Sequence, residues 1–181
     1  MEVFLQAIFE LIKDQWLFIG FALAAVITVV LSVFTVDQQD VAIITRFGKF
    51  VRLAHAGLNF KIPFVEDVAG TVSLRVEQLD VEVSTKTKDN VFVTLIVSVQ
   101  NVAIREQIED AYYKLDDVDS QMTAYVSDAV RAKVPTLDLD DAFERKDDIA
   151  DAVQEALTAA MAQNGWKIVK ALVTDISPDE K

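Results

Sequence analysis

The most strongly hydrophobic part of the chain lies near its start. Residues 16–34, WLFIGFALAAVITVVLSVF, contain no charged side chain, and a helix of this length would extend about 28 Å, close to the thickness of a hydrocarbon core. The residues before it carry Glu2, Glu10 and Asp14 against Lys13, which is the wrong sign for a signal peptide. We therefore predict a transmembrane helix over residues 16–35. Its apolar side chains include Trp16, Phe18, Leu23, Val26, Val30 and Phe34.

Residues 1–15 have the pattern of an amphipathic helix. Polar residues recur at positions 2, 6, 10 and 13, and the apolar residues at positions 4, 8, 11 and 12 lie opposite them at helical spacing. This pattern predicts a helix in the membrane interface before the span, and a frayed tail is the alternative. Arg46, Lys49 and Arg52 follow the span, against Lys13 and the amino terminus before it. The positive-inside rule therefore favours a single-pass protein with a cytoplasmic C-terminal part.

Residues 41–99 have the alternating pattern of strands. The apolar run 41–45 comes first, then Leu79, Val81 and Val83 alternate with polar residues, and residues 91–100 alternate again. Between the last two runs, the segment TKTKDN has the composition of a turn. We predict a long antiparallel hairpin, whose second strand is apolar enough on both faces to lie inside a sheet.

From residue 104 onward the apolar spacing becomes helical. The stripes cover residues 108–115, 122–134 and 142–161. The second stripe stops at Pro135, and the third is closed by Asn164 and Gly165. Residues 166–176 then return to strand composition. This order of strands, helices and one late strand predicts an α+β domain with packed helices and a mixed or antiparallel sheet, in which the late strand rejoins the early ones.

The residue counts exclude several classes of function. Asp and Glu number 29 against 17 Lys and Arg, and the net charge of −12 opposes binding to a nucleic-acid backbone. The chain has no cysteine, and with His55 as its single histidine it has neither thiolate chemistry nor a His-based triad or multi-histidine metal site. The five glycines are too dispersed for a phosphate-binding loop. We expect a solvated loop at His55, no enzyme activity, no cofactor and no metal.

Two acidic groups precede the second and third helical stripes. Residues 116–119 (DDVD) come before one and residues 138–141 (DLDD) before the next, where carboxylates accept hydrogen bonds from exposed helical N–H groups. Calcium binding is the alternative. An EF-hand loop starting at Asp138 requires glycine and glutamate where this chain has Phe143 and Ile149. Helix capping is therefore the prediction, with Asp138 or the aspartate two residues later opening the third helix.

Aromatic residues alternate with basic ones shortly after the predicted span. In the segment RFGKFVRLAHAGLNFKIPF, residues 46–64, lysines and arginines are interleaved with phenylalanines. A surface that places aromatic side chains in the membrane interface and its cations at the lipid headgroups has this composition. A sheet core with ordinary surface cations is the alternative. The candidate membrane-interface residues are Phe47, Phe50, Phe60 and Phe64.

Basic residues are also interspersed among the acids of the helical region. Copies of one chain that pack side by side can pair such charges with one another. For any single charge, a solvated position is the alternative. The candidate inter-subunit residues are Arg131, Lys133, Arg145 and Lys146.

Several segments together resemble one known family. The stretches VDQQDVAIITRFGKF, TKTKDNVFV, LDDAFE and GWKIVKALVTDISPDEK, in this order, are similar to the SPFH or band 7 family of stomatins, prohibitins and flotillins, above all to the hypersensitive-induced-reaction type and its bacterial relatives. The resemblance covers residues 36–181. It departs at residues 56–58, Ala-Gly-Leu, where the family has Pro-Gly, although Gly57 still permits the turn.

The resemblance implies an SPFH domain over residues 36–181 behind the single membrane helix. Members of the family act as oligomeric membrane scaffolds. The implied function is therefore organisation of a membrane microdomain by rings or cages of many copies, with lipids and further copies of itself as partners. The alternative is an accessory or regulatory subunit of a membrane-anchored AAA protease, and a membrane-anchored enzyme comes third.

The family also continues into a long coiled-coil helix after its last strand. Residues 177–180, Ser-Pro-Asp-Glu, have the composition of a helix start, with serine as the cap and proline at the first helical position. We therefore expect a coiled-coil helix beyond Lys181.

Overall fold

The computed structural model describes residue 16 and residues 19–178. The chain forms two compact units, unit 1 over residues 1–71 and unit 2 over residues 72–181, so the segment expected as a single domain includes parts of both. The predicted interfacial helix at residues 1–15 lies outside the described residues, and so do residues 179–181.

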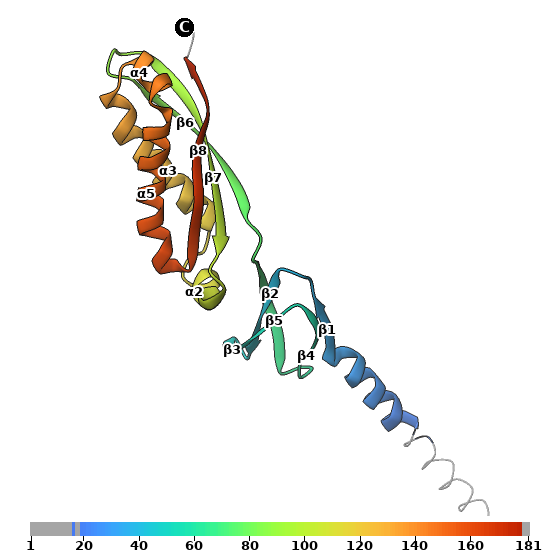
Figure 1. The fold of residues 1–181 in the computed structure, drawn as a ribbon. Helices are drawn as coiled ribbons and strands as arrows, with labels where there is room; N and C mark the ends of the chain where they lie inside the picture. Colours follow the sequence, from blue (N-terminus) through green and yellow to red (C-terminus); the bar gives the residue numbers. More distant parts are fainter. Residues whose placement is uncertain (1–15, 17–18, 179–181) are drawn as a thin grey trace, which may run out of the picture. The chain divides into compact units, whose positions relative to one another are not determined.

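Among the described residues, unit 1 begins with a helix at residues 19–32 and continues in short strands (Figure 1). These strands are β1 (Val33–Val36), β2 (Asp40–Arg46), β3 (Lys49–Ala54), β4 (Gly57–Phe60) and β5 (Glu66–Ser73), whose last two residues belong to unit 2. Strand β1 pairs antiparallel with β4, and β2 is the central strand of a second sheet in the order β3-β2-β5. The side chains of residues 41–45 in β2 are all buried, as expected of a central strand.

The helix of unit 1 ends earlier than predicted. It stops at Ser32, and Phe34 lies in β1, where it packs against a small core that includes Val36 and Ile44. The prediction that Phe34 belongs to the membrane span is therefore wrong, because the β-branched residues around it pair with β4 instead. In the part of the chain that the structure describes, no helix is both long and apolar enough to cross a membrane.

Unit 2 is built on the predicted hairpin. Strands β6 (Glu77–Lys86) and β7 (Phe92–Ala103) pair antiparallel, and β8 (Trp166–Pro178) pairs antiparallel with the other edge of β7. The hairpin and the return of the late strand are thus confirmed. The register of β7 with β8 shifts after Ile96 and after Gln100. Such irregularities increase the local twist of an edge strand.

Helices connect β7 to β8 in unit 2. They are η1 (Arg105–Gln107), α2 (Ile108–Tyr113), α3 (Val118–Lys133), η2 (Val134–Thr136), α4 (Leu139–Glu144), α5 (Lys146–Met161) and η3 (Ala162–Asn164). Figure 1 shows α3 and α5 along one face of the sheet. Their buried stripes face the buried face of β7. The fully buried side chains of this core include Leu95, Val97, Met122, Val126, Ile149, Val153 and Leu157.

Two predictions on the ends of elements are wrong in unit 2. The third helical stripe is two helices, because the backbone of Arg145 leaves the helical conformation (φ −109°, ψ 31°) between α4 and α5. The predicted helix start at Ser177 is part of β8, in which Ser177 and Pro178 pair with Thr94 and Val93. Proline is tolerated there because β8 is an edge strand, and on one of its sides no neighbouring strand needs a backbone N–H group.

The two acidic groups behave differently as caps. Asp117 is the N-cap of α3 and accepts a hydrogen bond from the Ser120 amide at 3.0 Å, which confirms the capping prediction for this group. Asp138 occupies the N-cap position of α4, but its side chain makes no capping hydrogen bond. Its carboxylate instead lies 3.3 Å from the Lys88 ammonium at the tip of the β6–β7 hairpin. The second acidic group thus helps to attach that tip to the helices.

Candidate membrane interface

Unit 1 carries a set of exposed large apolar side chains. Phe47 and Phe64 are 82% and 86% exposed, and Phe60 is also exposed. For these three residues the alternative interpretation, a sheet core, is wrong. Phe50 is half-buried on β3 opposite Thr45. Exposed Leu58 and Ile62 extend the apolar character of the β4 region.

The two most exposed phenylalanines have unusual backbone conformations. Phe47 (φ 50°) and Gly48 (φ 78°) form the two-residue turn between β2 and β3, and Phe64 (φ 65°) lies in the turn before β5. A left-handed conformation costs a bulky residue about 1–2 kcal/mol, which Asn or Gly in its place would avoid. Neither ring recovers this cost by burial within the chain. Strain of this kind concentrates where a surface contacts something outside the chain.

The β4 region is attached directly to the end of the helix. The Lys61 amide donates a hydrogen bond of 2.7 Å to the carbonyl of Ser32, the last residue of the helix. Phe60, the last residue of β4, is the register partner of Val33, the first residue of β1. The ladder then leads away from the helix and finishes with Val36 opposite Gly57. Phe60 and Lys61 therefore lie level with the C-terminal end of the helix.

A buried carboxylate is bonded to the segments that carry the exposed aromatic residues. Glu66 accepts hydrogen bonds from Arg46 at 2.8 Å, from Arg52 at 3.4 Å and from the Ile62 amide at 3.2 Å. Arg52 also donates a hydrogen bond to the Phe60 carbonyl. The hydrogen bonds from Arg46 and from the Ile62 amide lower the pKa of Glu66, against the effect of burial. Glu66 is thus an anion at neutral pH that joins β2, β3 and the turn containing Phe64.

A comparison with known protein families identifies the chain. The model of the family described as "SPFH domain / Band 7 family" matches residues 34–181, which include parts of both units. The protein belongs to the SPFH/Band 7 family. Members of this family are membrane-associated scaffold or regulatory proteins.

Several named proteins are similar to this chain. Hypersensitive-induced response protein 4 of Arabidopsis thaliana is 41% identical over 145 residues, which are 80% of this chain and 50% of that protein. Human mitochondrial stomatin-like protein 2 is 27% identical over 78% of this chain and 39% of its own length. Stomatin-like protein stl-1 of Caenorhabditis elegans is 25% identical over 81% and 45%. The chain thus spans half or less of the length of these three relatives.

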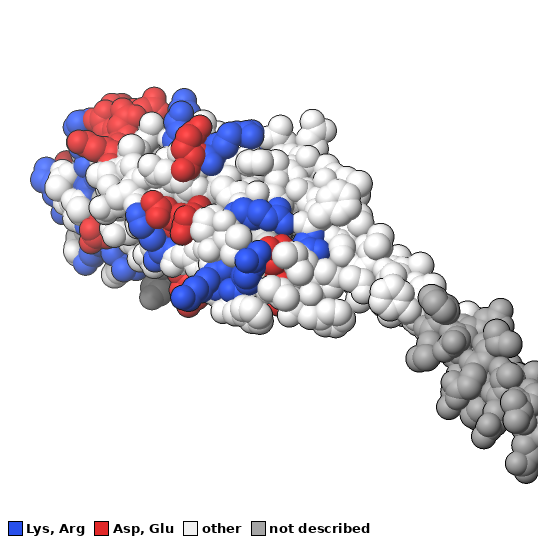
Figure 2. Space-filling view, turned by 90° about the horizontal axis from the view of Figure 1, so that it is seen from below, with Lys and Arg blue, Asp and Glu red and all other residues white. Residues whose placement is uncertain are grey.

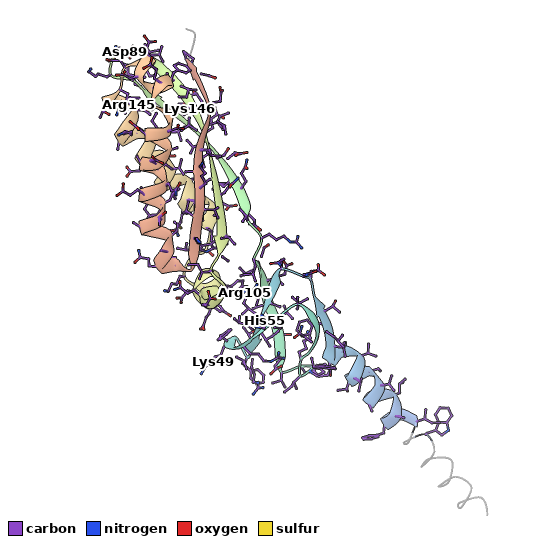
Figure 3. The ribbon with its side chains drawn as sticks, in the orientation of Figure 1. Lys49, His55, Asp89, Arg105, Arg145 and Lys146 are labelled. Atoms are coloured by element: carbon purple, nitrogen blue, oxygen red, sulfur yellow. The ribbon has the colours of Figure 1, made fainter. Side chains whose placement is uncertain are left out.

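The candidate inter-subunit cations of the SPFH protein lie on unit 2. Arg131 and Lys133 are in the last turn of α3, where positive charge stabilises the helix end. Figure 3 shows Arg145 and Lys146 at the junction of α4 and α5. Arg145 donates two hydrogen bonds to the Asp148 carboxylate, at 2.8 and 2.6 Å, and so is already paired within the chain. Lys146 and Arg131 are exposed, and Lys133 is half-buried.

Of the side chains predicted for the membrane span, those on the described helix are exposed, whereas Phe34 packs in β1. Leu23, Val26 and Val30 are exposed on the helix, as is Trp16, and Phe18 lies outside the described residues. Two polar residues of the helix bond within it: Thr28 donates to the Ala24 carbonyl and Ser32 to the Thr28 carbonyl. These bonds leave the helix surface apolar.

Sequence reasoning missed Glu66 as a functional residue. It follows no periodic pattern, and its partners are up to 20 residues away in the chain. The available signal was one acid at the end of a segment rich in lysine and arginine, which a search for charge partners could have noticed. His55 lies in an exposed loop as expected, and no group of metal-ligating side chains occurs within the described ranges.

Proposed function

We propose that this protein is a membrane-anchored scaffold, in which the uncharged segment from residue 16 to Ser32 crosses the bilayer and the β4 region of unit 1 lies in the membrane interface. The hydrogen bond between Lys61 and Ser32 is the observation that carries this proposal. The C-terminal end of a spanning helix lies at the level of the headgroups. Phe60 and Lys61 share that level, and an aromatic ring beside a cation suits it.

Membrane contact also accounts for the two strained phenylalanines. Transfer of apolar area out of water stabilises by about 25 cal/mol per Å², so insertion of an exposed phenylalanine ring offsets the cost of its left-handed backbone. Phe64 lies three residues after Lys61 and is 86% exposed. The ring is therefore available for insertion beside the helix end.

Spin labelling tests this placement directly. The chain has no cysteine, so single variants Phe64→Cys and His55→Cys each carry one nitroxide label without background. His55 is the control in the same unit. The β1–β4 ladder begins at the helix and ends with Gly57, and His55 precedes Gly57 at that far end. In proteoliposomes we expect the label at 64 to be accessible to oxygen and shielded from an aqueous nickel complex, and the label at 55 to show the reverse. Equal aqueous exposure of both labels would contradict the proposal.

We further propose that scaffolding occurs by self-assembly through the charged surface of unit 2. Figure 2 shows acidic and basic side chains interspersed on the face that it draws. The helices of unit 2 carry exposed charges of both signs, among them Arg131, Lys146 and Asp147. Mixed charge of this kind allows identical copies to pair their surfaces. No contact of the described residues specifically favours an accessory role toward an AAA protease, so the scaffold is the function we propose.

Charge reversal on unit 2 tests the assembly. Because Arg145 already pairs with Asp148, we choose the exposed Arg131 and Lys146, and expect Arg131→Glu with Lys146→Glu to reduce oligomer size without loss of secondary structure. Each exposed pair contributes only about 0.2–1 kcal/mol, but every copy in an assembly loses it. Sedimentation in detergent measures the size and circular dichroism the fold.

A matched control for this experiment is Lys167→Glu with Lys170→Glu. Both lysines are exposed on β8, and the change in net charge is the same. If the two double variants reduce oligomer size equally, the effect is one of overall charge, and Arg131 and Lys146 are not interface residues.

A further inference from the structure

We propose that Glu66 is a positioning residue for the membrane-contacting aromatic side chains of unit 1. This inference rests on the membrane contact proposed above and adds the group that sets its geometry. Two contacts of the Glu66 carboxylate, with Arg46 and with the Ile62 amide, reach turns that bear Phe47 and Phe64. The third, with Arg52, reaches Phe60 indirectly, because Arg52 also donates to the Phe60 carbonyl. No other described carboxylate of unit 1 is buried.

The first contact holds the turn between β2 and β3. Arg46 is the last residue of β2, and Phe47 follows it directly at the tip. The Arg46 guanidinium lies 2.8 Å from one carboxylate oxygen of Glu66. The ion pair therefore fixes the end of β2 next to the exposed Phe47.

The other carboxylate oxygen holds β4 and the turn that follows it. It accepts hydrogen bonds from the Ile62 amide and from Arg52, and Arg52 in turn donates to the Phe60 carbonyl. The Glu66 amide also donates to the Ile62 carbonyl at 2.8 Å. Glu66 thus closes the turn around Phe64 with both its backbone and its side chain. Hydrogen bonds to an ionised group are roughly twice as strong as neutral ones, which suits a residue that must hold a left-handed backbone in place.

The test uses the complete chain in vesicles of phosphatidylcholine and phosphatidylglycerol, with the nitroxide at residue 64. We expect Glu66→Gln to lower the inserted population of the label by about tenfold, because the left-handed conformation is then held by weaker contacts. Asp67→Asn is the matched control, since Asp67 is the neighbouring carboxylate and is exposed. It should leave the label unchanged. An inserted label that Glu66→Gln does not shift would overturn the positioning role, whereas a label that is aqueous in the parent protein would overturn the membrane contact itself.

A pH profile separates positioning by the charge from a general structural role. The groups that face the carboxylate are Arg46 from β2, Arg52 from β3 and the Ile62 amide. Because the folded-state pKa of Glu66 is lowered, its contribution is complete above its ordinary pKa of 4.5 and is lost as the pH falls through the folded value. The label at 64 should therefore loosen in acid in the parent and in Asp67→Asn, and show no such transition in Glu66→Gln. If Glu66→Gln shows the same acid transition as the parent, the proposal is contradicted.

A second variant keeps the test informative if Glu66→Gln does not fold. Arg46 is about half-exposed, so Arg46→Gln disturbs the core little. It removes the contact to the Phe47 turn and leaves the contacts of Glu66 with Arg52 and Ile62 in place. We expect a label at residue 47 to gain mobility and a label at 64 to keep its depth. Equal loosening of both labels would show a loss of general stability and would overturn the proposal.

Discussion

Replacing Ala25 and Val29 by aspartate is expected to abolish stable membrane integration of this protein. Both residues lie one turn apart in the middle of the uncharged segment 16–34, and both are exposed on the helix. A carboxylate at the centre of a spanning helix costs about 2.5–3.5 kcal/mol on insertion scales, so two cost about 5–7 kcal/mol. Extraction of membranes with alkaline carbonate measures the effect, because an integrated protein stays in the pellet.

The appropriate control replaces the same residues by leucine. Ala25→Leu with Val29→Leu changes size at both positions and keeps the segment apolar, so the protein should remain in the carbonate pellet. If carbonate releases the parent protein as well, the helix does not span the bilayer. The β4 region would then have no reason to lie at the headgroups.

A second large effect is expected from Gly165→Ala in unit 2. Gly165 has φ +83° at the point where η3 is followed by β8. A Cβ atom there would lie 2.6 Å from the Gln107 carbonyl oxygen and 2.8 Å from the Ala111 amide nitrogen. Both neighbours are backbone atoms and cannot rotate away. The left-handed backbone and the overlap together should cost about 2–5 kcal/mol, which is a large part of the stability of a small domain.

Thermal unfolding followed by circular dichroism measures this loss. For a unit of this size we expect the melting temperature to fall by about 10–20 °C. Gly48→Ala is a matched control, since Gly48 has nearly the same φ, +78°, and no atom lies within 4 Å of the place that the alanine methyl group would take. That variant should cost only the backbone term of about 1–2 kcal/mol. Similar losses in both variants would mean that the close approach at Gly165 is not what requires glycine.

The elements that sequence reasoning predicted well are those set by local periodicity. The β6–β7 hairpin, α3 and the late strand β8 follow directly from the spacing of apolar residues. The errors are at boundaries, where two local preferences compete. Residues 33–36 are apolar enough for a membrane helix, but their pairing with β4 makes them a strand. The break at Arg145 likewise has no Pro or Gly to announce it in the sequence.

The candidate membrane interface was predicted in part. The alternation of phenylalanines with cations identified Phe47, Phe60 and Phe64, which are exposed in the structure. The same pattern also selected Phe50, which is half-buried, because periodicity alone does not show which face of β3 is covered. Glu66 was missed since its role depends on contacts between segments that are distant in sequence. The inter-subunit role of the exposed cations of unit 2 stays a prediction.

The position of β7 at the centre of its sheet has a consequence during synthesis. β7 pairs with β6 across a short turn, but its partners in β8 are at least 63 residues later in the chain. Until the ribosome has delivered β8, the newly made hairpin presents one free edge and the apolar face that includes Leu95 and Val97. Such edges pair readily with other nascent chains. The yield of this protein therefore depends on neighbouring polysomes and on chaperones, and not on the stability of its finished fold alone.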